Sequence, residues 1–171
     1  MKRIITMTVL NRPGVLNRIT NLFSKRNYNI ESISVGLTEQ EGVSRITCVV
    51  HVENDGMVEQ ITKQLNKQID VLKVADISDQ AIVARELILM KVPVLPHNRA
   101  EIYSIIEPFR ASVIDVSKDS IIIQLTGETE KIEAFIDLIK PYGIRELART
   151  GTTAFPRGNQ RTGQQKTFSF V

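Results

Sequence analysis

The stretch NRPGVLNRITNLFSKRNYNIESI, residues 11–33, sets the pattern from which the fold is inferred. Its apolar residues recur at the spacing of one helix face: Val15, Leu16, Ile19, Leu22 and Phe23. We expect a helix over about residues 13–27, with Asn11 as its capping residue and Pro13 in its first turn. Because this helix is amphipathic, it is expected to cover one face of a sheet.

Two copies of one element order, strand-helix-strand-strand-helix-strand, follow each other along the chain. The first copy has expected strands at about residues 2–10, 28–37, 43–52 and 71–77, and its second helix carries Val58, Ile61, Leu65 and Ile69 on one face. The second copy has expected strands at about residues 85–94, 112–116, 120–126 and 144–148, with Asn98 and Glu101 as a capping box and Ile132, Phe135, Ile136 and Ile139 on its second helix. This order predicts an α+β fold of two consecutive ferredoxin-like βαββαβ units.

The expected boundaries are a first domain at residues 1–79, a second at 80–158 and a disordered tail at 159–171, where the sequence becomes polar. Each domain is small enough for its own core to be marginal. In VSRITCVVHV, residues 43–52, alternate side chains face opposite sides, so one side is apolar and the other mixed. Small sheets with exposed faces and edges tend to pair, and we therefore expect a homodimer built by the first unit.

Composition excludes several classes of protein. The net charge of +3 is too small to indicate a nucleic-acid-binding protein by itself, and no apolar run approaches the about 18 residues of a membrane span. The first ten residues do not resemble a secretory signal. The single cysteine, Cys48, cannot form an internal disulfide, so we expect a cytoplasmic protein.

Catalytic and cofactor motifs are also missing from the sequence. His51 and His97 are the only histidines, and no HExxH, CxxC or glycine-rich phosphate loop occurs, so we expect no catalytic and no metal-ligating residues. Cys48 falls on an apolar strand face, which favours a buried, inert thiol. RNA recognition by the RRM type needs aromatic side chains on the central strands, and IITMTVL and VSRITCVVHV have none.

The entry to the first helix is the remaining candidate site. Free N–H groups in a first helical turn favour an anion, and Gly14 allows close approach. Asn11 and Asn29 each offer a donor and an acceptor, and the group suits the carboxylate and ammonium of an amino acid, with Val15 and Ile30 near its side chain. An interruption of the second strand near residues 31–32 indicates a bulge beside this site. A plain capped helix with Asn29 in a turn is the alternative interpretation.

NRPGVLNRITNLFSKRNYNIESISVG, GVSRITCVV and QLNKQIDVLKV closely resemble the ACT domain of the acetolactate synthase small, regulatory subunits. ARELILMKV, IIEPFRASVIDVS and ELARTGTTAFPRG resemble the C-terminal domain of the same family, and together the resemblance covers about residues 1–158. It implies a subunit without catalysis of its own. Its expected partner is the large catalytic subunit, which carries thiamine diphosphate, FAD and magnesium; this chain is expected to bind no cofactor.

The resemblance also implies feedback inhibition by valine in branched-chain amino-acid synthesis, with valine bound between two ACT domains. Carried over residue by residue, the expected contacts are Asn11, Gly14, Val15 and Leu16, with Asn29 and Ile30 across the dimer interface. Two other functions remain as alternatives. A free-standing amino-acid sensor acting on transcription would need a helix-turn-helix segment, and a small enzyme would need an acid–base or metal cluster.

Overall fold

The computed structural model describes residues 1–158, which form two units. The first contains residues 1–83 together with residues 152–158, and the second contains residues 84–151. Each unit contains one antiparallel sheet and two helices, which confirms the predicted pair of ferredoxin-like units. The tail expected at residues 159–171 lies outside the described residues.

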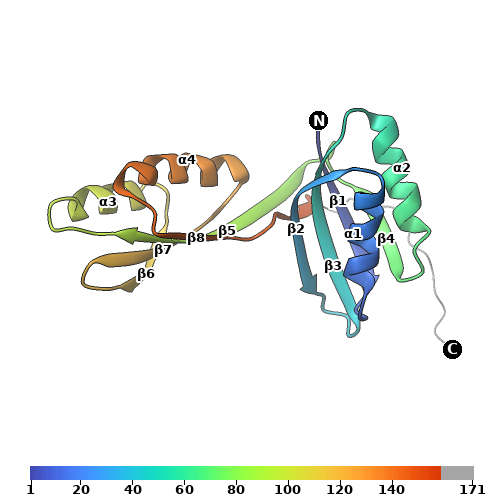
Figure 1. Ribbon diagram of the computed structural model, residues 1–171, viewed down its shortest axis with the longest axis horizontal. Helices are drawn as coiled ribbons and strands as arrows, with labels where there is room; N and C mark the ends of the chain where they lie inside the picture. The colour runs from blue at the N-terminus through green and yellow to red at the C-terminus, as the bar shows by residue number, and fades with distance from the viewer. Residues whose placement is uncertain (159–171) are drawn as a thin grey trace. The chain divides into compact units, whose positions relative to one another are not determined.

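The first unit is a four-stranded sheet with two helices on one face, as Figure 1 shows. Its elements are β1 (Lys2–Leu10), α1 (Val15–Lys25), β2 (Asn29–Leu37), β3 (Val43–His51), α2 (Asp55–Asn66) and β4 (Val71–Asp76). The strand order is β2-β3-β1-β4, so β2 and β4 form the two edges. Each neighbouring pair is antiparallel, and β1 and β2 therefore run in the same direction on either side of β3.

Strand alternation places the core of this unit between the sheet and its helices. Ile46, Cys48 and Val50 of β3 are almost fully buried in one cluster with Ile19 and Phe23 of α1, as their spacing predicts. Burial raises the pKa of the Cys48 thiol to about 12, because an apolar environment disfavours the thiolate. The thiol is thus an inert core group, as expected.

Two local predictions for this unit can be compared with the structure. The register of β2 against β3 shifts between Ile30 and Ser32, which confirms the predicted bulge. The prediction that Ile69 lies on the α2 stripe is wrong, because α2 ends at Asn66 and Ile69 is 85% exposed. Asn54 begins α2 as its capping residue: its side chain accepts a hydrogen bond from the N–H of Met57 at 3.0 Å.

The second unit has the same plan, with both helices on one face of its sheet (Figure 1). Its elements are β5 (Ile82–Pro93), α3 (Arg99–Ile106), β6 (Ser112–Val116), β7 (Ser120–Gly127), α4 (Thr129–Ile139), a short 3-10 helix (Lys140–Tyr142) and β8 (Glu146–Arg149). The predicted capping box is wrong, because the Asn98 side chain accepts a hydrogen bond from the N–H of Leu95 at 2.8 Å and caps nothing in α3. Phe135 packs in the core, 5.2 Å from Phe109 between ring centroids.

A last strand, β9 (Thr153–Pro156), has no counterpart in the sequence prediction. It pairs with β5, and its residues also lie on the sheet face of the first unit that α1 and α2 leave open. The Thr152 N–H donates to the Ser32 hydroxyl, and the hydroxyls of Thr153 and Ser34 are 3.2 Å apart. Residues 152–158 therefore pack with the first unit, whereas the sequence-based division assigned them to a domain at residues 80–158.

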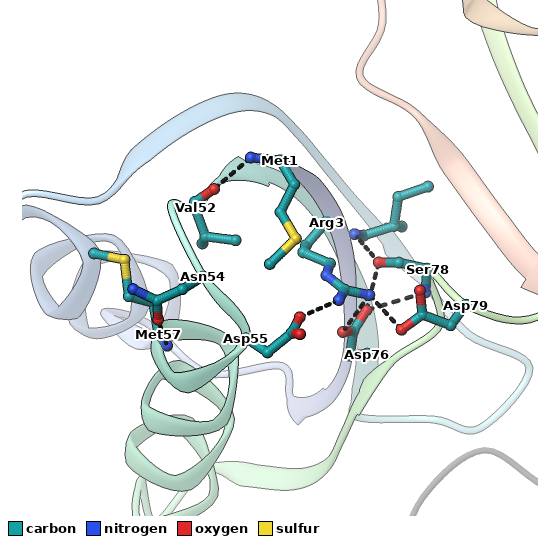
Figure 2. A network of polar contacts seen from close by, with 10 residues as sticks. Met1, Arg3, Val52, Asn54, Asp55, Met57, Asp76, Ser78 and Asp79 are labelled. Carbon is teal, nitrogen blue, oxygen red and sulfur yellow. Dashed lines mark hydrogen bonds and ion pairs between the residues drawn. The ribbon is translucent and has the colours of Figure 1, made fainter.

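Arg3 ties three segments of the first unit together, as Figure 2 shows. Its side chain is only 10% exposed, and its guanidinium donates hydrogen bonds to Asp79 and Asp55. The carboxylate of Asp76 lies 3.6 Å away. The hydrogen bonds to Asp79 and Asp55 raise the pKa of Arg3 above its ordinary value. One buried cation thus joins β1 to the start of α2 and to the turn that follows β4.

We predict that Arg3→Met lowers the urea midpoint of unfolding clearly more than Lys2→Met does. Both substitutions remove one cation from β1. Arg3 is buried with several carboxylates facing it, whereas Lys2 is half-exposed and pairs with Glu31 at 3.1 Å. Exposed ion pairs contribute little to stability. Equal midpoints for the two variants would show that Arg3 does not stabilise the fold in this way.

Candidate functional site

The turn that enters α1, residues 11–14, differs from the capped helix expected from the sequence. Gly14 is the residue that precedes the helix, with a φ of 82°, and no side chain caps it. The prediction that Asn11 caps α1 is therefore wrong. The side chain of Asn11 is exposed, and its backbone N–H donates a hydrogen bond to the carbonyl of Gly42 at 2.8 Å. Only glycine adopts a positive φ here at no steric cost.

One of the N–H groups at this helix start is not free. The Val15 N–H donates to the carbonyl of Arg12 at 3.3 Å, so it is already engaged. The N–H groups of Leu16 and Asn17 form no hydrogen bond with any residue from 1 to 158. They are the donors that a bound carboxylate can reach, and their partial positive charge favours an anion.

Two arginines that the sequence analysis did not single out lie beside this turn. The guanidinium of Arg18 pairs with the buried carboxylate of Asp70. The backbone carbonyl of Asp70 also accepts a hydrogen bond from the N–H of Leu10 at 2.8 Å. Arg12 approaches the same carboxylate at 3.9 Å. A methyl group added at Gly14 would lie 3.2 Å from an Arg18 nitrogen, so Arg18 is fixed directly against the turn. Helical spacing could have shown that Arg18 follows Gly14 by one turn, but not that Asp70 holds it.

Asn29 and Ile30 lie at the opposite end of the same sheet. Asn29 pairs with His51, which pairs with Lys2 at the start of β1. The turn at residues 11–14 instead follows the end of β1, where Leu10 pairs with Val43. At roughly 3.3 Å per residue, the nine residues of β1 separate the two groups by about 25–30 Å. One chain therefore does not bring together the two halves of the predicted site.

Burial decides which side chains of the predicted site are accessible. Val15 is 4% exposed and belongs to the core, so its side chain cannot line a ligand pocket. Leu16 is 43% exposed, and Ile30 is partly buried at the edge of the core cluster. The apolar contacts available to a ligand are accordingly Leu16 at one end of the sheet and Ile30 at the other.

Within residues 1–158, no three side chains of the His, Cys, Asp or Glu type are grouped closely enough to hold a metal ion. His51 is exposed, with its Nδ1 3.9 Å from Glu31, which also pairs with Lys2. In the same part of the chain, no helix combines the length and apolar character needed to cross a bilayer.

A βαββαβ unit with an open sheet edge and free N–H groups at the start of its first helix has the architecture of an ACT-type domain. Comparison with known proteins agrees. Residues 5–73 match the AHAS small subunit-like ACT domain, and residues 85–158 match the family described as the small subunit of acetolactate synthase. The chain therefore belongs to the acetolactate synthase small-subunit family, whose members are regulatory subunits of the catalytic enzyme.

Individual relatives share the whole length of the chain. The acetolactate synthase small subunit of Bacillus subtilis is 69% identical over 172 residues and covers 100% of both chains. That of Mycolicibacterium smegmatis is 46% identical over 95% of each chain. The crystal structure of the acetolactate synthase small subunit from Thermotoga maritima has a TM-score of 0.86 and 39% identity, and covers 94% of this chain and 99% of that one.

We predict that Gly14→Ala destabilises the fold by about 1–2 kcal/mol, the cost of a left-handed conformation for a residue with a Cβ. Gly36→Ala is the matched control, because Gly36 has no positive φ and nothing lies within 4 Å of an added Cβ. The control should be neutral, or more stable by up to about 1 kcal/mol. Urea unfolding gives both values. Equal stability of the two variants would contradict the strained turn.

Proposed function

We propose that the chain activates the large catalytic subunit of acetolactate synthase and confers feedback inhibition by valine. Membership of the small-subunit family supports the partnership with the catalytic subunit. The observation that carries the valine site is the separation of Asn29 from the turn at residues 11–14 along one sheet. Two copies of the chain are needed to bring these groups together.

The edge position of β2 supplies the required arrangement. If β2 of one copy pairs antiparallel with β2 of a second, the start of one strand lies beside the end of the other. The end of β2 adjoins the turn at residues 11–14, since Asn11 is bonded to Gly42 in the β2–β3 turn. Asn29 of the second copy then approaches this turn. The exposed Val35 and Leu37 of β2 are covered in the same step.

The residues at this interface match the chemistry of valine. Its carboxylate is placed against the N–H groups of Leu16 and Asn17, with the positive charge of Arg18 nearby. Its ammonium is placed against the amide oxygens of Asn11 and of Asn29 in the second copy. Ile30 of the second copy and Leu16 provide the apolar surface for the isopropyl group.

The expected affinity is moderate. Each hydrogen bond to the charged carboxylate contributes about 1.5–3 kcal/mol. Burial of the isopropyl group adds about 1.5–3 kcal/mol. The loss of translational and rotational freedom on binding opposes these gains by at least about 4 kcal/mol. A dissociation constant on the order of micromolar to millimolar follows, which suits a sensor of a free amino acid.

Inhibition requires two arrangements of the assembly that bind valine differently. Valine held between two first units stabilises their pairing, and the arrangement so favoured withdraws activation from the catalytic subunit. A coupling of about 1–3 kcal/mol is sufficient for a strong response. In this proposal the catalytic subunit, and not this chain, binds thiamine diphosphate, FAD and magnesium. The buried Cys48 thiol is in keeping with a reducing, cytoplasmic setting.

A mixed-dimer experiment tests the shared site. Asn11→Ala and Asn29→Ala should each abolish valine binding, because every site in either homodimer lacks one amide. A mixture of the two variants should recover about a quarter of the wild-type sites, since half of randomly formed dimers are mixed and each has one intact site. Titration calorimetry measures the number of sites. No recovery would contradict a site formed by two copies.

The regulatory role is tested with Gly14→Asp in complex with the catalytic subunit. Acetolactate formation should stay at the wild-type level without valine but lose its inhibition by valine, because the new carboxylate repels that of the ligand. Ser24→Asp is the control, since it adds the same charge to an exposed position near the other end of α1. Retained inhibition in Gly14→Asp would contradict this site, and loss of inhibition in Ser24→Asp would point to a general effect of charge.

A further inference from the structure

A cavity of about 400 Å³ lies on the sheet face opposite α1 and α2, apart from the proposed valine site. Its floor is formed by Thr8, Thr47 and Arg45, which are neighbours in the β1–β3 register. The bulk of its wall is β2 and the turn after it, from Ser34 to Gln40, and Thr153 and Phe155 of β9 close another side. All of these residues belong to the first unit.

Arg45 is the cation of this cavity, and its contacts compensate its charge only in part. Its guanidinium lies over the ring of Phe155 at 4.1 Å and makes a long hydrogen bond of 3.4 Å to the carbonyl of Ala154. Its Nε is buried and has no hydrogen-bond partner among residues 1–158, and Arg45 forms no ion pair within that range. The nearest carboxylate that acts on it electrostatically is Glu39.

A partly buried cation without an ion-pair partner is unfavourable. Burial lowers the pKa of Arg45, and Glu39 offsets only part of this effect. A guanidinium remains charged at all ordinary pH values, so the cost is not relieved by deprotonation. Bonding to an anionic oxygen would relieve it, because charge-assisted hydrogen bonds are the strongest that a guanidinium forms. An anionic oxygen is therefore a favourable partner for Arg45 in this cavity.

The remaining walls restrict the kind of anion. Phe155 is 54% exposed and borders this space beside Arg45. This large apolar side chain favours a ligand with an aliphatic part. Glu39 disfavours a second negative charge, which acts against phosphate and dicarboxylates. The volume falls in the range of small-molecule sites.

We propose that this cavity binds a small aliphatic monocarboxylate, with its carboxylate on the Arg45 guanidinium and its hydrocarbon part against Phe155. The hydroxyls of Thr8 and Thr47 lie beside Arg45 as further donors. Such a ligand touches β2, β3 and β9 at once, so it fastens the C-terminal strand to the open face of the first sheet.

The test is titration of the full-length chain with pentanoate, followed by calorimetry and by the shift in melting temperature. Pentanamide, which has the same shape without the charge, and inorganic phosphate serve as comparison ligands. We expect saturable binding of one pentanoate per chain and a raised melting temperature, with no comparable binding of the amide or of phosphate. Absence of pentanoate binding, or equal binding of the amide, would overturn the proposal.

Variants assign the binding to this cavity. Arg45→Gln should weaken pentanoate binding at least about tenfold, as the loss of a charged hydrogen bond implies. Gly36→Leu keeps Arg45 but fills the space beside it, since Gly36 pairs with Arg45 and has nothing within 4 Å of an added Cβ. This variant should also weaken pentanoate binding, so it tests the cavity even if Arg45→Gln does not fold.

Two further variants should bind pentanoate as the wild type does. Arg26→Gln removes an exposed arginine at the end of α1, and Gly14→Asp alters the proposed valine site. Wild-type affinity in Arg45→Gln or Gly36→Leu would overturn the site. Loss of binding in Gly14→Asp would place pentanoate at the valine site instead, and would equally overturn the proposal.

Discussion

The strand order β2-β3-β1-β4 is the constraint on which the function of the first unit depends. Because β1 and β2 run in the same direction with β3 between them, they start at one end of the sheet and finish at the other. The helix start that can receive an anion follows the end of β1, whereas Asn29 opens β2. A ligand that needs both must therefore join two molecules, and the unpaired edge of β2 provides the surface on which they can meet.

The two faces of the same sheet have different roles. One face carries α1, α2 and an apolar core in which Cys48 and its neighbours are fully buried. The other face is polar around Thr47 and Arg45 and receives the strand β9, which returns from the far end of the sequence. At the start of β1, Arg3 joins this strand to the turn that follows β4. The first unit is thus completed by residues that lie outside the βαββαβ pattern itself.

Periodicity predicted the repeated fold well because the residues that define each face are local in sequence. The alternation of Ile46, Cys48 and Val50 appears as expected, and so does the stripe of α1 apart from the exposed Leu16. Predictions that depended on the exact conformation of a turn were less successful. Asn11 and Asn98 have the right side chains for capping, but Gly14 takes a positive φ and Asn98 bonds back to Leu95. The β9 strand was missed because its pairing with β5 and its contacts with Ser34 and Arg45 join residues far apart in sequence.

The candidate site shows the same division. Side-chain chemistry was enough to select Asn11, Gly14 and Asn29. The ion pair between Asp70 and Arg18 could not be predicted, because it depends on tertiary structure alone. The apolar stripe of α1 correctly indicated that Val15 faces the core, so the second expectation, that its side chain lies near the ligand, is wrong. The bulge after Ile30 was predicted correctly, because a change in the apolar alternation of a strand can be seen in its own sequence, without its partner strand.

The most direct test of a shared site is the dissociation constant of the dimer, measured by sedimentation at several valine concentrations. If valine binds between two first units, linkage requires that the dimer dissociates less readily as valine rises. A dissociation constant that is independent of valine, with one valine bound to each separate monomer, would contradict the account.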